Sequence, residues 1–148
     1  METHTHTEVI SAPLELCFDV LVDFKHYPDW FGMIQNSRII ESDVAAGTWT
    51  VEHTLNAIVR TIRYTLAYQS KRPRELTWKM VAGDLAAIVG SYELVQLEPG
   101  LTEATCTQAL DIGFWVPGPL RRIFEQSALT DSVREFKKAV EERADELD

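Results

Sequence analysis

Six consecutive strand-like segments fill the middle of the chain and constrain its fold more than any other feature. Turn-forming residues such as Pro73, Gly83 and Gly100 lie in the short links between them, and no helix of normal length intervenes. Because parallel neighbours need long crossovers, short links predict an antiparallel sheet. A further strand is predicted at residues 5–10. The six segments are residues 34–42, 47–56, 59–69, 75–81, 87–97 and 103–111.

Apolar and polar side chains alternate along these segments, which gives each of them one dry face and one wet face. Such a sheet must be covered on its dry side. The residues expected on the dry face are Trp49, Val51, His53 and Leu55, then Ile62, Tyr64, Leu66 and Tyr68, then Leu76, Trp78 and Met80, and finally Ala104, Cys106, Gln108 and Leu110.

A long C-terminal helix, from about residue 119 to about residue 146, is the expected cover. Its apolar residues form two stripes that lie roughly opposite on an ideal helix, so a straight helix cannot bury both against one sheet. We therefore predict a bend or register change near 127–129. The first stripe is Leu120, Ile123, Phe124 and Ser127, and the second is Leu129, Val133, Phe136 and Val140.

Two shorter helical segments are predicted between the first strand and the sheet. After Pro13, residues Leu14, Cys17, Phe18 and Leu21 fall on one helical face. A brief second helix or turn follows at residues 23–32. The whole pattern predicts one α+β domain over residues 1–148, in which a curved antiparallel sheet of about seven strands packs on a final helix.

The charge balance excludes several classes of partner. With 23 acidic and 14 basic residues, the net charge of −9 disfavours nucleic acid and anionic membrane surfaces. No apolar window is long enough to span a membrane, and the N-terminus does not resemble a secretory signal. Two cysteines, Cys17 and Cys106, are expected to be buried thiols in a reducing compartment, so we predict a cytoplasmic protein.

Several short motifs resemble the START/Bet v 1-like (SRPBCC) superfamily, and most closely its bacterial polyketide cyclase/dehydrase and coenzyme-Q-binding START-type branch. They are residues 10–15 (ISAPLE), 18–24 (FDVLVDF), 27–30 (YPDW), 90–94 (GSYEL) and 114–120 (FWVPGPL). The resemblance spans nearly the whole chain. It implies the helix-grip fold, which runs as one strand, two helices, six strands and a last helix, and which matches the order predicted from the residues.

The resemblance also implies a cavity between the concave sheet and the last helix, with a mouth near the Trp30 loop. A small hydrophobic ligand is then the expected partner, and no cofactor is expected. The candidate lining residues are Trp30, Trp49, Val51, His53, Tyr64, Tyr68, Trp78, Tyr92, Gln108, Ile123, Phe124 and Ser127.

His53 is the best candidate for chemistry because it occupies an inward position among apolar neighbours. It is either a general base, a hydrogen-bonding group for a ligand carbonyl, or a core histidine satisfied by a neighbour. Gln108 needs a partner if buried, which a ligand, a water or Tyr92 would provide. Arg60 has inward parity at the start of its strand, where it either extends to solvent or anchors a ligand acid.

Other signatures of chemistry are missing from the sequence. No histidine or cysteine pair has zinc spacing, and His4 and His6 fit a polar lead-in better than a weak metal site. Three functions therefore stay open. The first is binding or carriage of a lipid-, quinone- or polyketide-like molecule, and the second is a polyketide aromatase/cyclase or dehydrase. The third is a protein-interaction module that uses the acidic tail at residues 141–148 or the Trp30 surface.

Overall fold

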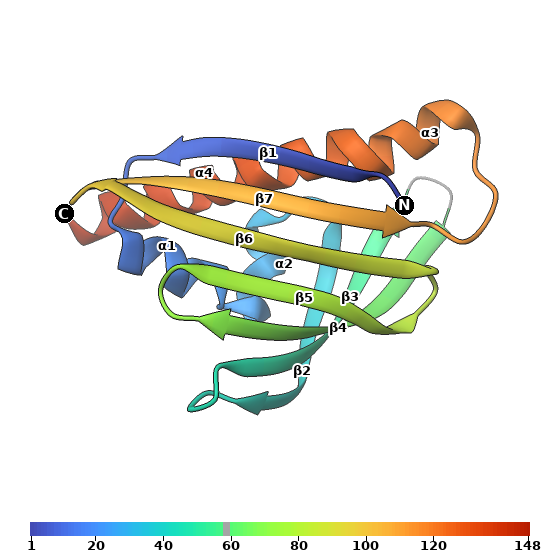
Figure 1. The fold of residues 1–148 in the computed structure, drawn as a ribbon, viewed down its shortest axis with the longest axis horizontal. Coiled ribbons are helices and arrows are strands. Elements are labelled where there is room, and N and C mark those ends of the chain that lie inside the picture. The colour runs from blue at the N-terminus through green and yellow to red at the C-terminus, as the bar shows by residue number, and fades with distance from the viewer. Residues whose placement is uncertain (58–59) are drawn as a thin grey trace.

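An antiparallel sheet is the main element of the structure, a computed structural model that describes residues 1–57 and 60–148 (Figure 1). Its strands are β1 (Thr3–Ile10), β2 (Ile34–Asp43), β3 (Thr48–Ala57), β4 (Arg60–Lys71), β5 (Glu75–Gly83), β6 (Ala87–Glu98) and β7 (Leu101–Asp111). The order across the seven-stranded sheet is β1-β7-β6-β5-β4-β3-β2. Strands β2 to β7 thus form an antiparallel meander, as the short links predicted, and β1 pairs with the last strand.

Pairing between β1 and β7 explains why both strands begin earlier than the residue pattern indicated. Their register joins Thr3 to Ala109 and Ile10 to Thr102, so the polar lead-in at the N-terminus is held as strand by its partner. The segment expected to begin at Val59 is described from Arg60 onward, and Val59 itself lies outside the described residues.

Two groups of helical elements flank the meander, one before β2 and one after β7. Helix α1 (Leu14–Leu21), the 3₁₀ turn η1 (Phe24–His26) and helix α2 (Tyr27–Trp30) connect β1 to β2. Helix α3 (Gly118–Arg122), the π-helical turn η2 (Ile123–Ser127) and helix α4 (Ala128–Leu147) follow β7. Within the described ranges, no helix is both long and apolar enough to cross a membrane.

The π-helical turn η2 is the register change that the two apolar stripes of the last helix predicted. A π turn is wider than an α turn, so it shifts the stripe of the preceding residues relative to those that follow. As a result, Phe124 and Leu129 lie on the same side of the helix, which faces the interior of the molecule, and both are buried. The C-terminal segment therefore covers the sheet continuously, although its pattern of apolar residues does not fit a straight helix.

The space between sheet and helix is closed at the end where α1 packs. Helix α1 contacts α4, β6 and β7 there (Figure 1). The side chains Phe18, Leu94, Val133 and Val140 are almost completely buried at this end. The other end lies under η2 and the start of α4, and the buried side chain of His53 faces the space there.

Candidate ligand-binding cavity

A cavity of about 120 Å³ lies between the inner face of the sheet and the first half of the C-terminal helix. Strands β3 to β7 supply one wall, the segment from α2 to the start of β2 supplies a second, and η2 with the start of α4 supplies the third. The lining residues are Leu21, Tyr27, Trp30, Phe31, Met33, Ile34, His53, Leu55, Ile62, Tyr64, Leu66, Tyr68, Trp78, Leu85, Ile88, Tyr92, Cys106, Gln108, Leu110, Ile112, Phe124, Ala128, Leu129 and Ser132.

Most of the candidate residues named from the sequence lie in this wall. Strand alternation placed the six strand residues of this set on the inner face, whereas Trp30 comes from α2 and Phe124 from η2, and the structure brings all of them together around one space. They are Trp30, His53, Tyr64, Tyr68, Trp78, Tyr92, Gln108 and Phe124.

Four candidates lie elsewhere. Trp49 packs edge-on against the ring of Phe24, 5.3 Å between centroids, outside the cavity wall. Val51 is fully buried in the packed core rather than at the cavity. Ile123 and Ser127 are exposed because the π turn presents Phe124 to the interior and rotates its neighbours outward. Periodicity gave the correct sheet face for Trp49 and Val51, but not their position along it.

Sequence reasoning missed a group of lining residues in irregular or helical positions. Tyr27, Phe31 and Met33 lie in or beside α2, where side-chain direction does not follow a simple period. Ala128 and Ser132 line the cavity because η2 changes the helical register. The dense aromatic run of residues 24–31 is the sequence signal for the lining residues in or beside α2, although it could not give the orientation of their side chains.

The main polar feature of the cavity is a buried chain of three side chains from three adjacent strands. His53 on β3 lies between Ser37 on β2 and Tyr68 on β4. Its Nδ1 atom is 2.7 Å from Ser37 Oγ, and its Nε2 atom is 2.8 Å from the Tyr68 hydroxyl. A neutral imidazole has one donor and one acceptor nitrogen, so it satisfies both contacts in either tautomer. His53 is therefore a paired core histidine, and Ser37 is the partner that the sequence did not reveal.

The ring of His53 is also held by aromatic packing. Tyr27 stacks on it with 5.7 Å between centroids and an interplanar angle of 12°. The hydroxyl of Tyr27 donates to the backbone carbonyl of Leu21, which fixes the tyrosine in place. Packing and hydrogen bonds together leave the imidazole a single orientation in the wall.

Burial decides the ionisation state of these groups. Desolvation lowers the pKa of His53 from 6.5 to about 4, because the charged imidazolium loses its hydration in the interior. The same effect raises the pKa of Tyr27, Tyr64 and Tyr68 above the ordinary value of 10.0. At neutral pH the histidine is therefore unprotonated, and each tyrosine keeps its hydroxyl proton.

Cysteine chemistry is suppressed by the same desolvation. It raises the pKa of Cys17 from 9.0 to about 11, and it raises the pKa of Cys106 as well. Both thiols are free and buried. Because the thiolate is the nucleophilic form, neither side chain has the properties of a catalytic cysteine.

A second polar contact lies between β5 and β7. The indole nitrogen of Trp78 donates to Gln108 Oε1 at 3.0 Å, which provides the partner that a buried amide oxygen needs. Gly90 lies directly beneath the indole ring, since a Cβ atom there would come within 2.4–2.5 Å of three of its atoms. The absence of a side chain at position 90 thus lets Trp78 lie flat in the wall.

Arg60 does not reach the cavity. Its side chain is exposed, and its guanidinium lies 4.4 Å from the centroid of the Phe114 ring. The sequence left two roles open for Arg60, extension to solvent and anchoring of a ligand acid. The structure agrees with the first, because the side chain lies at the solvent-exposed rim. The lining residues within the described chain include no Asp, Glu, Lys or Arg, so the cavity wall carries no ionised side chain at neutral pH.

Comparison with known proteins agrees with this architecture. The family described as polyketide cyclase/dehydrase and lipid transport matches residues 1–144. The chain belongs to this family. Its expected place in the START-type superfamily and its helix-grip α+β fold are therefore confirmed. No curated protein matches the sequence.

Solved structures similar to this polyketide cyclase/dehydrase family member share its fold at low sequence identity. The Zhui aromatase/cyclase from a Streptomyces species gives a TM-score of 0.84 at 17% identity, over 96% of this chain and 94% of that one. A START superfamily protein from Mycobacterium smegmatis gives 0.80 at 18% identity, over 99% of both chains. The di-domain aromatase/cyclase StfQ from the steffimycin pathway gives 0.74 at 15% identity, over 95% of this chain and 45% of that one.

Proposed function

We propose that this protein binds or carries a small, uncharged hydrophobic molecule of the lipid, quinone or polyketide class in the cavity between sheet and helix. The observation that carries the proposal is the composition of the wall, which is apolar and aromatic with a few hydrogen-bonded neutral groups. Ligand sites commonly combine an apolar wall with a small number of placed polar groups. The family description, which includes lipid transport, supports the same class of ligand.

The neutrality of the wall supports an uncharged ligand. A carboxylate or ammonium placed there would lose its hydration and meet no opposite charge among the described lining residues, which is strongly unfavourable. A hydroxyl or carbonyl group can instead hydrogen-bond to the Tyr68 hydroxyl. Because His53 can exchange tautomers, the hydroxyl of Tyr68 can act toward a ligand as donor or as acceptor.

The size of the cavity bears on the ligand's dimensions. A volume of about 120 Å³ is smaller than the ~300–1,000 Å³ of typical drug-sized sites, and a dry cavity of roughly this size holds about one aromatic ring. A larger ligand therefore requires the wall to move. The short elements η2 and α3 are the parts of the cover with the fewest buried residues, so we expect expansion there.

Native mass spectrometry of the untagged protein purified from its own host tests the proposal. We expect a retained neutral organic molecule that is released on denaturation. A protein that is empty, and that binds no quinone, neutral lipid or aromatic polyketide when these are added, would contradict it. A Phe124→Trp variant, which fills the wall, is the matched control and is expected to lose the retained molecule while remaining folded.

A second candidate function is catalysis by an aromatase/cyclase or dehydrase, which the family and the fold of the Zhui aromatase/cyclase favour. The ionisation of His53 bears on it directly. A pKa of about 4 makes the imidazole a weak base at neutral pH, whereas general bases work best when their pKa is near the working pH. Binding therefore has the stronger support.

An assay for turnover of a linear polyketide that can cyclise to an aromatic product separates the two functions. If the protein is an enzyme that uses His53, turnover should fall at least about tenfold in His53→Ala, since a general base contributes that much or more. Binding without turnover in the unaltered protein is the result expected from the proposed function. Turnover that His53→Ala leaves unchanged would show that His53 is structural or only contacts the ligand.

A further inference from the structure

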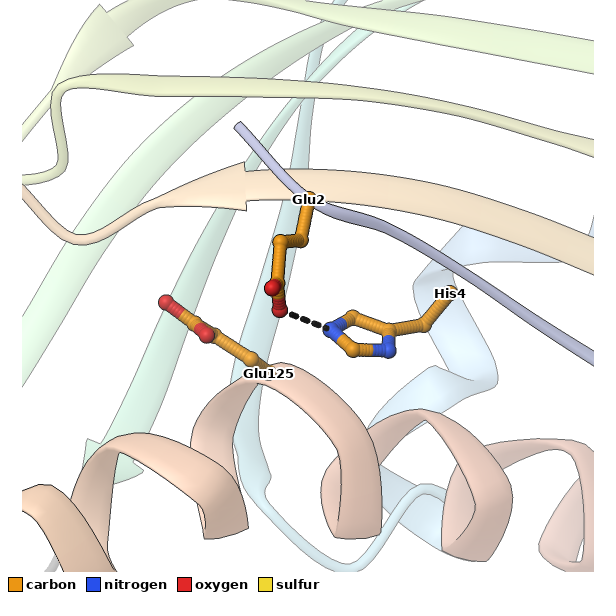
Figure 2. A group of neighbouring side chains, drawn as sticks. All are labelled: Glu2, His4 and Glu125. Carbon is orange, nitrogen blue, oxygen red and sulfur yellow. Dashed lines mark ion pairs between the residues drawn. The ribbon is translucent and has the colours of Figure 1, made fainter.

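A cluster of three potential metal ligands lies outside the cavity, where the start of the first strand meets the C-terminal helix. Glu2 lies directly before β1, His4 lies near the start of β1, and Glu125 comes from the π turn η2. Their ligand atoms all lie within 4.8 Å of one another. Figure 2 shows the three side chains in the space between the strand and the helix, with the Glu2 carboxylate beside the His4 ring. The chain thus brings together residues more than a hundred positions apart.

The imidazole of His4 has an unsatisfied nitrogen in this cluster. Its Nε2 atom is buried from solvent and has no hydrogen-bond partner within the described part of the chain. The nearest carboxylate oxygen, from Glu2, is 3.7 Å away, which is too long for a hydrogen bond. Burying a polar atom without a partner is unfavourable, so this nitrogen indicates a missing ligand at that point.

The charges of the two carboxylates also indicate a missing ligand, and specifically a cation. Glu2 and Glu125 bring two negative charges close together, and like charges at this separation repel unless a cation lies between them. Arg121 is the nearest candidate cation, but its Nη1 atom is 3.9 Å from Glu125 Oε1, beyond hydrogen-bond distance. The repulsion between the carboxylates is therefore only partly offset by this arginine.

We propose that Glu2, His4 and Glu125 form a binding site for one divalent transition-metal ion of the Zn²⁺ type. One imidazole nitrogen and two carboxylate oxygens suit such an ion, with water completing the coordination. A tetrahedral ion at about 2.0–2.2 Å from each ligand would hold the ligand atoms roughly 3.4 Å apart. Glu2 is largely exposed, so its side chain can make the small movement that this requires.

A neighbouring histidine on the same strand shows the difference between this cluster and an ordinary ion pair. The Nε2 atom of His6 is in hydrogen-bond contact with Glu8, and Arg134 lies 3.6 Å from the same carboxylate. This interaction lowers the pKa of Glu8, so the pair is satisfied without any added ion. His4 and His6 lie on one face of β1, but only His4 lacks a partner among the described residues.

Metal binding at this site would connect the N-terminal strand to the irregular part of the helix. Glu125 follows Phe124, whose side chain lines the cavity. An ion that ties Glu125 to β1 would restrain η2, which is where we expect the cavity wall to move. The metal site itself does not depend on the proposed ligand-binding function, and its test needs no cavity ligand.

Isothermal titration calorimetry with ZnCl₂ at neutral pH, on protein without a polyhistidine tag and with its native N-terminus, tests the proposal. We expect one ion to bind per chain. His4→Asn and Glu125→Gln should each weaken binding at least about tenfold, since even groups that only support a metal ligand contribute this much. Titration with Co²⁺ should give visible absorption from the bound ion, which both variants lose.

His6→Asn is the matched control, because it removes a histidine from the same strand and face and should leave Zn²⁺ affinity unchanged. Thermal unfolding of each variant without metal verifies that the variants fold. Equal Zn²⁺ affinity in the unaltered protein, His4→Asn and Glu125→Gln would overturn the proposal. The absence of Zn²⁺ binding to the unaltered protein would overturn it as well.

Discussion

The two halves of the space between sheet and helix differ although the same sheet and the same helix enclose both. At the closed half, Val133, Phe136 and Val140 have no exposed surface, and α1 fills the remaining volume. At the hollow half, Phe124 and Leu129 face a cavity of about 120 Å³. The difference lies in what the strands present opposite the helix.

Opposite the hollow half, the strands present large side chains that are held by hydrogen bonds. His53 is bonded to Ser37 and Tyr68, and Trp78 is bonded to Gln108. Collapse of these rings into the cavity would break the bonds and leave buried polar atoms without partners, which is unfavourable. The polar contacts thus keep the space open, whereas the apolar side chains of the closed half pack without such constraints.

The largest expected effect comes from truncating the closed half. Phe136→Ala should lower the free energy of unfolding by about 3–5 kcal/mol, since it removes a fully buried ring that also packs against Tyr92 and Trp30. Phe124→Ala in the hollow half should cost less than half of that, because its ring already faces empty space. Urea denaturation measures both. Equal costs would show that the two halves do not differ in packing.

The second prediction concerns pH and the buried histidine of the hollow half. Its pKa is 6.5 when unfolded and about 4 when folded, so the unfolded chain takes up the proton first as pH falls. This contribution to the free energy of unfolding should decline between pH 6.5 and 4, by about 3 kcal/mol in total. His53→Gln lacks the titrating group, so its urea-unfolding profile should be flatter over this range. Parallel profiles for the two proteins would contradict the assigned burial.

A third prediction tests the hydrogen bond that keeps the wall in place. Tyr68→Phe should lower the free energy of unfolding by about 1–3 kcal/mol, because it leaves a nitrogen of His53 buried without a partner. Tyr64→Phe is the control, since Tyr64 lies on the same strand and lines the same cavity without a hydrogen bond to any described side chain. It should cost less than about 0.5 kcal/mol. Similar costs for both variants would show that the His53 contact is not stabilising.

Much of this molecule could be predicted from its sequence because β-strand alternation is a short-range pattern. The inner face of β3 to β5, and the register change in the last helix, follow from side-chain spacing alone. The pairing of Ser37 with His53 did not, since it depends on the register between β2 and β3, which contains two irregularities. Glu125 was equally hidden, because no spacing rule relates the π turn to the N-terminus.

The remaining errors concern position along an element rather than its type. Trp49 has the inward phase of its strand but packs on Phe24, beyond the cavity. Tyr27 was assigned to a brief helix or turn, which is too short for a period to give the direction of a side chain, yet it forms part of the wall. Local patterns thus specify which face a residue occupies, while the tertiary arrangement decides which part of that face surrounds empty space.

Binding of matched neutral and charged probes tests the central claim, that the hollow half is an uncharged ligand cavity. NMR titration at pH 7 compares 4-methylphenol with 4-methylbenzoate, two molecules of similar shape that differ in charge. We expect 4-methylphenol to bind at least about tenfold more tightly, with shifts at residues around His53 and Tyr68, because the wall offers no charge to the carboxylate. Equal or tighter binding of 4-methylbenzoate at the same residues would contradict the account.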